Sequence, residues 1–270
     1  MKIVLFSSTG YVGGMLKEFI QGKKNVQLLG LTRKNKLDEY YGDYDILIYS
    51  ASVSRADAEK YIKDNVLTAI KMMDFSKRHH IKRIIYLSSD SIYGGINTEE
   101  VSENAVMVAP DFYGTTKYLA ERIIMESGIP YYILRMPGIV GKVWRNTYLY
   151  RLMDSLCRHE TVTVYNGEKN FNNVLDIDDL IQFIMLLCSL KKENSEIFLL
   201  GNTEKIELSK IVSYVKGLCQ SASEINFIST KDKRYFTLNV DKAVTYGYSS
   251  KSIWDIIDGL YKIKNIGGQT

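Results

Sequence analysis

The residues best suited to chemistry are Tyr113 and Lys117, with Ser89 upstream in the segment SSDSIYG at 88–94. On a helix, residues i and i+4 share one face about one turn apart. Lowering a tyrosine pKa from about 10 to near 7 takes about 4 kcal/mol, which one cation at ~4 Å in a partly buried site can supply. The pair therefore predicts a proton donor and acceptor for neutral pH, with the Ser89 hydroxyl holding a carbonyl or alcohol oxygen beside it. Because the chain has 20 tyrosines, a tyrosine and a lysine at this spacing can also arise by chance. The preceding sequence is therefore needed to distinguish a catalytic pair from a chance one.

The start of the chain predicts the element that would hold a cofactor. Residues 2–6 are a short apolar run typical of a buried strand, and apolar residues at helical spacing continue from position 15 to Gly22. In the turn between them, Gly10 lets the backbone approach a pyrophosphate and Gly13 lets the helix pack on the strand, while the helix N-terminus faces the anion. An ordinary turn between strand and helix is the alternative. The residues predicted to contact the cofactor here are Thr9, Gly10, Tyr11, Val12 and Gly13.

The end of the second predicted strand, at 26–31, bears on the choice of cofactor. An NAD site usually has an acidic residue there for the ribose 2′-hydroxyl. This chain has Thr32 and Arg33 instead. A guanidinium forms a bidentate pair with a 2′-phosphate, which a carboxylate would repel. The sequence therefore favours NADP(H), bound through Thr32 and Arg33, and leaves NAD(H) possible; a solvated basic loop is the alternative explanation.

In this order, the motifs resemble the extended short-chain dehydrogenase/reductase family, which comprises nucleotide-sugar epimerases, dehydratases and reductases. The resemblance runs from the first residue to about Leu190. The family's Gly-xx-Gly-xx-Gly motif appears with Ser7 in place of the first glycine. The resemblance implies that Ser89, Tyr113 and Lys117 form the catalytic triad.

The resemblance also implies further site residues. Ala51 and Ser52, at the end of the third strand, line the cofactor cleft, and Asn65 braces the active-site helix and contributes to the cofactor site. Pro137 belongs to a strand and turn at 135–141 that closes over the nicotinamide, and Asn172 opens a late substrate-side segment where many members have an arginine. Tyr113 and Lys117 are expected to contact the cofactor as well. The residues predicted to contact substrate are Ser89, Asp90, Ser91, Tyr113 and Asn172.

Composition excludes several classes of protein. Of 270 residues, 46% are hydrophobic and 24% are charged, which is enough to bury a full α/β core. The net charge of +4 suits anionic small ligands and does not indicate nucleic-acid binding. No apolar run reaches transmembrane length, and the first strand begins directly after Met1, so we expect neither a membrane span nor a signal peptide. Cys157, Cys188 and Cys219 are widely spaced and predict reduced thiols in a cytoplasmic protein without a metal site.

The order of elements predicts the fold. Strand-like runs near 2–6, 26–31, 45–51, 83–88 and 131–135 alternate with helical stretches near 11–21, 55–79 and 113–127. This alternation predicts an α/β fold with a doubly wound parallel sheet of the Rossmann type. We expect an NADP-binding domain with the catalytic residues at 1–165. A smaller substrate-binding α/β region, interleaved with late Rossmann elements, is expected at 166–270. The family resemblance implies a homodimer.

The predicted function is NADPH-dependent reduction of a keto group on a nucleotide-activated deoxysugar, as in sugar-nucleotide 4-ketoreductases. Dehydratases of the family place two acidic residues after the catalytic hydroxyl, and here Asp90 is followed by Ser91, so elimination of water is not favoured. An NAD-dependent nucleotide-sugar epimerase is the first alternative. A non-catalytic dinucleotide-binding sensor is the second, although a sensor would not need Ser89, Tyr113 and Lys117.

Overall fold

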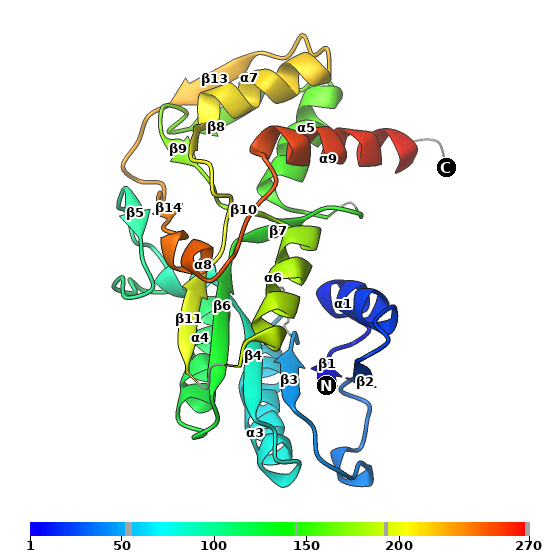
Figure 1. The fold of residues 1–270 in the computed structure, drawn as a ribbon. Helices are drawn as coiled ribbons and strands as arrows, with labels where there is room; N and C mark the ends of the chain where they lie inside the picture. Colours follow the sequence, from blue (N-terminus) through cyan, green and yellow to red (C-terminus); the bar gives the residue numbers. More distant parts are fainter. Residues whose placement is uncertain (52–55, 144, 192–193, 268–270) are drawn as a thin grey trace. The chain divides into compact units, whose positions relative to one another are not determined.

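The computed structural model describes residues 1–51, 56–143, 145–191 and 194–267 (Figure 1). Within this part of the chain two compact units form. The first unit contains residues 1–95, 106–136 and 181–199, and the second contains 96–105, 137–180 and 200–270. The predicted boundary at residue 165 falls inside the second unit, because the chain leaves the first unit after Met136 and returns to it for one later segment.

The first unit is built on a parallel sheet of six strands in the order β11-β6-β4-β3-β1-β2. Helices lie on both faces of this sheet, so the predicted doubly wound Rossmann fold is confirmed (Figure 1). The chain reverses its direction of strand addition at β1, which pairs with β2 on one side and β3 on the other. Open parallel sheets bind ligands at such a reversal, outside the carboxyl ends of the strands. The strands are β1 (Lys2–Phe6), β2 (Gln27–Leu31), β3 (Ile46–Tyr49), β4 (Arg83–Ser89), β6 (Tyr131–Met136) and β11 (Glu196–Leu199).

The helices of this unit follow the predicted order with one difference in detail. A single helix was expected near 55–79, and the described part of it is instead α2 (Ala58–Tyr61), a π-helical segment η2 (Ile62–Leu67) and α3 (Thr68–Arg78). Between β2 and β3 there is only the short 3-10 turn η1 (Leu37–Glu39). The remaining helices are α1 (Tyr11–Gln21), α4 (Phe112–Met125) and α6 (Ile177–Ser189), which begins in the second unit.

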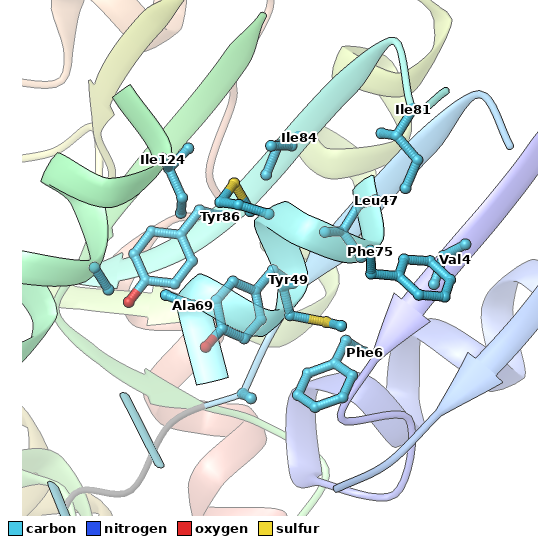
Figure 2. Packing of buried hydrophobic residues seen from close by; sticks show 14 of the residues in the cluster. Val4, Phe6, Leu47, Tyr49, Ala69, Phe75, Ile81, Ile84, Tyr86 and Ile124 are labelled. Atoms are coloured by element: carbon cyan, nitrogen blue, oxygen red, sulfur yellow. The ribbon is translucent and has the colours of Figure 1, made fainter. Parts of the chain in front are cut away.

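The core of the first unit explains why its strands are apolar on both faces. Figure 2 shows side chains of β1, β3 and β4 packed against α3 and α4. Every residue of β4 is buried, as expected for a central strand of a parallel sheet covered on both sides. The labelled residues are Val4, Phe6, Leu47, Tyr49, Ala69, Phe75, Ile81, Ile84, Tyr86 and Ile124.

The second unit combines helices with short paired strands around its own apolar core. Its helices are α5 (Tyr148–Cys157), α7 (Leu208–Leu218), α8 (Asp241–Thr245) and α9 (Ile253–Gly267). Three strand pairs are parallel: β7 (Gly138–Val140) with β10 (Val174–Asp176), β8 (Val162–Tyr165) with β13 (Ile225–Ile228), and β5 (Glu100–Val101) with β14 (Thr237–Leu238). One pair, β9 (Asn170–Phe171) with β12 (Ile206–Glu207), is antiparallel.

The structure corrects the prediction of three reduced thiols. Cys157 at the end of α5 and Cys219 just after α7 are joined by a disulfide, and Cys188 is a free, buried thiol. Residues far apart in the sequence come together here because α5 and α7 share one core. None of the described helices is long and apolar enough to cross a membrane. The cytoplasmic location stays a prediction.

Candidate active site

The candidate site begins where β4 ends. Ser89 is the last residue of β4 and is 8% exposed. Its hydroxyl oxygen accepts a hydrogen bond from the Ser91 backbone N–H at 3.1 Å, which caps the 3-10 turn η3 (Asp90–Tyr93). Its hydroxyl also lies 3.1 Å from the Ser91 hydroxyl. Asp90 is buried and Ser91 half-buried, so the predicted substrate-binding hydroxyls share one short turn at the carboxyl end of the sheet.

Helix α4 starts directly against this turn. Asp111 caps the helix by accepting a hydrogen bond from the Gly114 N–H at 2.7 Å. A Cβ on Gly114 would overlap the Ser91 carbonyl oxygen, so a glycine is needed for the helix to approach so closely. The adjacent Tyr113 is half-buried. The structure therefore brings Tyr113 and the Ser89 turn to the same end of the sheet.

Lys117 lies one helical turn further along α4 and is fully buried. Its Nζ donates a hydrogen bond to the Leu87 carbonyl oxygen at 2.6 Å and lies 4.2 Å from the centroid of the Tyr86 ring. Burial lowers the pKa of Lys117 to about 7, although the Glu121 carboxylate opposes this shift. An ammonium carries three donors, so the bond to Leu87 leaves two further N–H groups on Lys117.

Asn65 connects the π-helical segment η2 to helix α4. It is 1% exposed, and its side-chain amide donates to the Thr116 hydroxyl at 3.0 Å. The Thr116 hydroxyl in turn donates to the Tyr113 carbonyl oxygen at 3.0 Å. This chain of bonds ties the π-helical segment η2 to the backbone that carries Tyr113.

A buried ionic network behind the triad was missed by the sequence reasoning. The Arg135 guanidinium donates to both carboxylate oxygens of Glu121 at 2.8–3.2 Å, and the two side chains are 3% and 0% exposed. Arg135 also donates to the Tyr93 hydroxyl at 3.0 Å, and the Ser88 hydroxyl donates to Glu121. Glu121 stands four residues after Lys117, and this spacing was the available signal. Through Ser88 and Tyr93, this network connects α4 to residues on either side of Ser89.

The predicted pyrophosphate turn connects β1 to α1 and contains Ser7 in place of the first motif glycine. Ser7 takes a left-handed backbone conformation with φ 72°, which a glycine adopts at lower energy. The backbone N–H groups of Ser7 and Ser8 donate to the Leu31 carbonyl at 2.8 and 3.0 Å, which fixes the turn beside β2. A Cβ on Gly13 would overlap the Ser7 carbonyl oxygen, so this glycine is needed for α1 to pack on the turn.

The start of α1 suits an anion. The helix begins at Tyr11, with Gly10 as its extended cap residue. Within the described residues no side chain caps this end, and its first turn contains no acidic residue. Thr9 and Val12 belong to the same turn and helix start. The groups present therefore fit a dinucleotide pyrophosphate, which is bound by backbone N–H groups and the helix dipole.

A cleft of about 930 Å³ lies beyond this turn, where β2 ends. Thr32 is tied into the loop, because its backbone N–H and its hydroxyl both donate to the Asn35 side-chain oxygen, at 2.7 and 2.9 Å. The Arg33 guanidinium forms an ion pair with Asp64, which also pairs with Lys60 at 3.0 Å. The guanidinium on which the NADP prediction rests is therefore paired with a carboxylate, although its side chain remains 38% exposed.

The remaining predicted residues differ in their placement. Ala51 is buried just after β3, and Ser52 lies outside the described residues. Pro137 is buried and opens the second unit after β6. Asn172, also in the second unit, is fully buried; its amide donates to the Asn202 and Leu238 carbonyls, and its oxygen accepts from the Leu238 N–H. These bonds hold Asn172 inside its own unit, and we leave it out of the substrate site proposed below.

Comparisons with known proteins identify the family of this chain. Residues 14–201 match the NAD dependent epimerase/dehydratase family. An uncharacterized protein of Methanocaldococcus jannaschii is 26% identical over 182 residues, which cover 64% of this chain and 54% of that protein. A dTDP-glucose 4,6-dehydratase of an Actinoplanes species is 24% identical over 213 residues, 74% of this chain and 64% of the relative. The chain thus spans about half to two thirds of the length of these relatives.

Among solved structures, the UDP-glucuronic acid 4-epimerase of Bacillus cereus in complex with NAD superimposes with a TM-score of 0.82. It is 19% identical, and the alignment covers 98% of this chain and 99% of the epimerase. At this identity the superposition speaks for the fold alone. The family match covers most of the chain and includes the positions of Ser89, Tyr113 and Lys117. The chain belongs to the NAD dependent epimerase/dehydratase family.

Proposed function

We propose that the protein catalyses hydride transfer at a ring carbon of a nucleotide-activated sugar. The proposal is supported by the position of helix α4, which carries Tyr113 and the buried Lys117. This helix packs on the turn after Ser89 through Gly114 and on β4 through the bond from Lys117 to Leu87, in the same unit as the glycine turn after β1. The named relatives act on or bind nucleotide sugars, namely UDP-glucuronic acid and dTDP-glucose. Their chemistry defines the substrate class that we propose.

When bound, the nicotinamide supplies or accepts the hydride. In this proposal the Tyr113 phenol exchanges a proton with the reacting sugar oxygen. The Ser89 hydroxyl donates a hydrogen bond to that oxygen and so orients it. Lys117 stabilises the phenolate of Tyr113 with its ammonium, and Asn65 holds the backbone of Tyr113 through Thr116. In this proposal Tyr113 and Ser89 act on the reacting sugar oxygen, whereas Lys117 and Asn65 act on Tyr113.

Epimerisation with NAD that is regenerated in each cycle is the reaction we favour. Its support is the pairing of Arg33 with Asp64, which leaves no guanidinium free of an acidic partner at the described end of β2. Reduction of a keto sugar by NADPH, predicted from the sequence, is the second candidate, because Arg33 is still 38% exposed and stands at the position that a 2′-phosphate would reach. Dehydration is disfavoured by Ser91, which occupies the place of a second carboxylate.

The test is turnover of UDP-glucuronic acid and related nucleotide sugars without added cofactor, with the sugar configuration followed by NMR. Tyr113→Phe should lower turnover about 10²- to 10⁴-fold, the range of general acid–base catalysis, and leave nucleotide affinity nearly unchanged. Tyr118→Phe, on the same helix, is the matched control and should retain turnover. If Tyr113→Phe keeps full activity, the proton-transfer role is refuted. Turnover that requires added NADPH would favour the reductase.

We also propose that two copies pair through the helices that carry Asn65 and Tyr113. Large apolar side chains are 43–46% exposed on these helices, and a second copy would cover them. Light scattering should show a dimer, and Leu119→Glu should give a monomer that remains folded. A wild-type monomer at micromolar concentration would overturn this part. The exposed residues are Ile62, Leu67, Ile70, Phe112 and Leu119.

A further inference from the structure

The cleft at the end of β2 contains an acidic residue that the sequence reasoning did not consider. Asp64 belongs to the π-helical segment η2, directly before Asn65, and is 5% exposed. It lines the same cleft as Thr32 and Arg33. The usual acid of an NAD site is supplied by the end of the second strand. Here the fold brings a carboxylate to that place from a different element.

Two cations hold this carboxylate in its ionised form. The Arg33 guanidinium and the Lys60 ammonium both contact Asp64 Oδ2, the ammonium at 3.0 Å. Burial by itself would raise the pKa of Asp64, but the hydrogen bonds and charges of Lys60 and Arg33 outweigh it, and the pKa lies below its usual value. Within the described residues both contacts fall on Oδ2. Neither of these ion pairs occupies the second oxygen, Oδ1, and a carboxylate oxygen can accept a hydrogen bond from a hydroxyl.

The loop that carries Arg33 is fixed in a way that keeps the pair together. The Asn35 side chain accepts two hydrogen bonds from Thr32 and donates one to the Tyr40 hydroxyl at 2.7 Å. The Lys34 backbone N–H also donates to the Thr32 hydroxyl, at 3.3 Å. Arg33 therefore extends from a turn whose backbone is held by these hydrogen bonds, and its guanidinium contacts Asp64.

The balance of charges in the cleft also disfavours a 2′-phosphate. Among the described residues that line it, five are basic and five are acidic. A 2′-phosphate adds close to two negative charges and is bound by guanidinium or ammonium groups in excess of their acidic partners. Placed beside the ionised Asp64, it would meet a like charge in a partly buried site, where repulsion is weakly screened.

We propose that Asp64 selects the cofactor: it holds Arg33 in an ion pair and offers Oδ1 to an adenosine ribose hydroxyl, so that the protein binds NAD(H) in preference to NADP(H). This inference rests on the dinucleotide site of the proposed function and deepens it. It replaces the prediction that Arg33 binds a 2′-phosphate. In this arrangement Arg33 could bind the 2′-phosphate of NADP(H) only if it were released from Asp64.

The test is calorimetric titration of NAD⁺ and NADP⁺ into the protein freed of bound nucleotide. We expect wild type to bind NAD⁺ at least tenfold more tightly than NADP⁺. Asp64→Asn keeps the side-chain shape, removes the charge and releases Arg33, and should raise NADP⁺ affinity about tenfold or more while lowering that for NAD⁺. Adding Arg33→Ala to Asp64→Asn should abolish the gain for NADP⁺. Unfolding curves of each variant verify that the fold is retained.

Asp38→Asn is the matched control, because Asp38 lines the same cleft, pairs with Arg78 at 2.6 Å and is 88% exposed. It should leave the ratio of the two affinities unchanged. A wild-type preference for NADP⁺, or an Asp64→Asn ratio equal to that of wild type, would overturn the role of Asp64 while the dinucleotide site stands. Failure of wild type to bind either nucleotide would overturn the site itself and the inference with it.

Discussion

Neutralising Glu121 should destabilise the protein more than neutralising any exposed acid on the same helix. Both members of the Glu121–Arg135 pair are almost completely removed from water. In Glu121→Gln the shape is retained, but one carboxylate oxygen becomes an NH₂ group. If the NH₂ group replaces Oε2, it faces the two Arg135 N–H groups that now donate to that oxygen. If it replaces Oε1, the hydrogen bonds that Ser88 and Arg135 donate to Oε1 are lost. Arg135 is then a buried cation without a counter-charge.

Removing one partner of a buried pair lowers the free energy of unfolding by about 3–5 kcal/mol, whereas an exposed pair contributes about 0–1 kcal/mol. Helix α4 contains the matched control, since Arg122 and Glu126 pair at 2.6 Å with both side chains at least half exposed. We therefore expect a loss of ~3 kcal/mol or more for Glu121→Gln and below ~0.5 kcal/mol for Glu126→Gln. Combining Glu121→Leu with Arg135→Met should bring the stability nearer to wild type than either single change does, because no lone charge remains.

Urea unfolding followed by circular dichroism measures these differences, with the slope m checked for constancy across the variants. A loss below about 1 kcal/mol for Glu121→Gln, equal to that of Glu126→Gln, would refute the reasoning. It would mean that Arg135 finds water or another acceptor when Glu121 is neutral. Equal destabilisation by the double replacement and the single changes would also contradict it, because then packing and not charge would be responsible.

Burial lowers the pKa of Lys117 to about 7, below its value in the unfolded chain, so between these two values the unfolded chain binds more protons than the folded one. The free energy of unfolding, relative to that of Lys117→Met, should therefore rise with pH above 7 by roughly 1 kcal/mol per pH unit, as measured by urea unfolding. A flat difference would contradict the lowered pKa. Ser7→Gly should stabilise by about 1 kcal/mol by removing a left-handed serine, whereas Ser7→Ala should not; equal thermal melts of the two variants would rule out backbone strain. Gly114→Ala should lower both stability and turnover, because its Cβ would overlap the Ser91 carbonyl. In contrast, Gly14→Ala, which meets no atom within 4 Å, should stabilise α1 by up to about 1 kcal/mol, and similar unfolding curves for both glycine variants would refute the close approach.

The elements that depend on local pattern could be predicted well from the sequence. The apolar runs of the parallel strands, the turn at Gly10 and Gly13, and the helical spacing of Tyr113 and Lys117 are each contained within a short segment. The parallel, doubly wound sheet followed from the alternation of strands and helices, because such an alternation has few ways to fold. The predicted triad residues consequently lie at the carboxyl end of the sheet, although their roles await the kinetic test.

The features that could not be predicted all depend on partners distant in the sequence. The sequence could not show that Arg33 pairs with Asp64, or that the Asn172 side chain bonds backbone groups of Asn202 and Leu238. The disulfide between α5 and α7 could not be read from cysteine spacing for the same reason. By itself, the sequence determined which residues share a strand end or a helix face, because those periodicities are local. Only the tertiary structure decided which charge each side chain meets and how deeply it is buried, and these two quantities determine whether a polar group binds a ligand or holds the fold together.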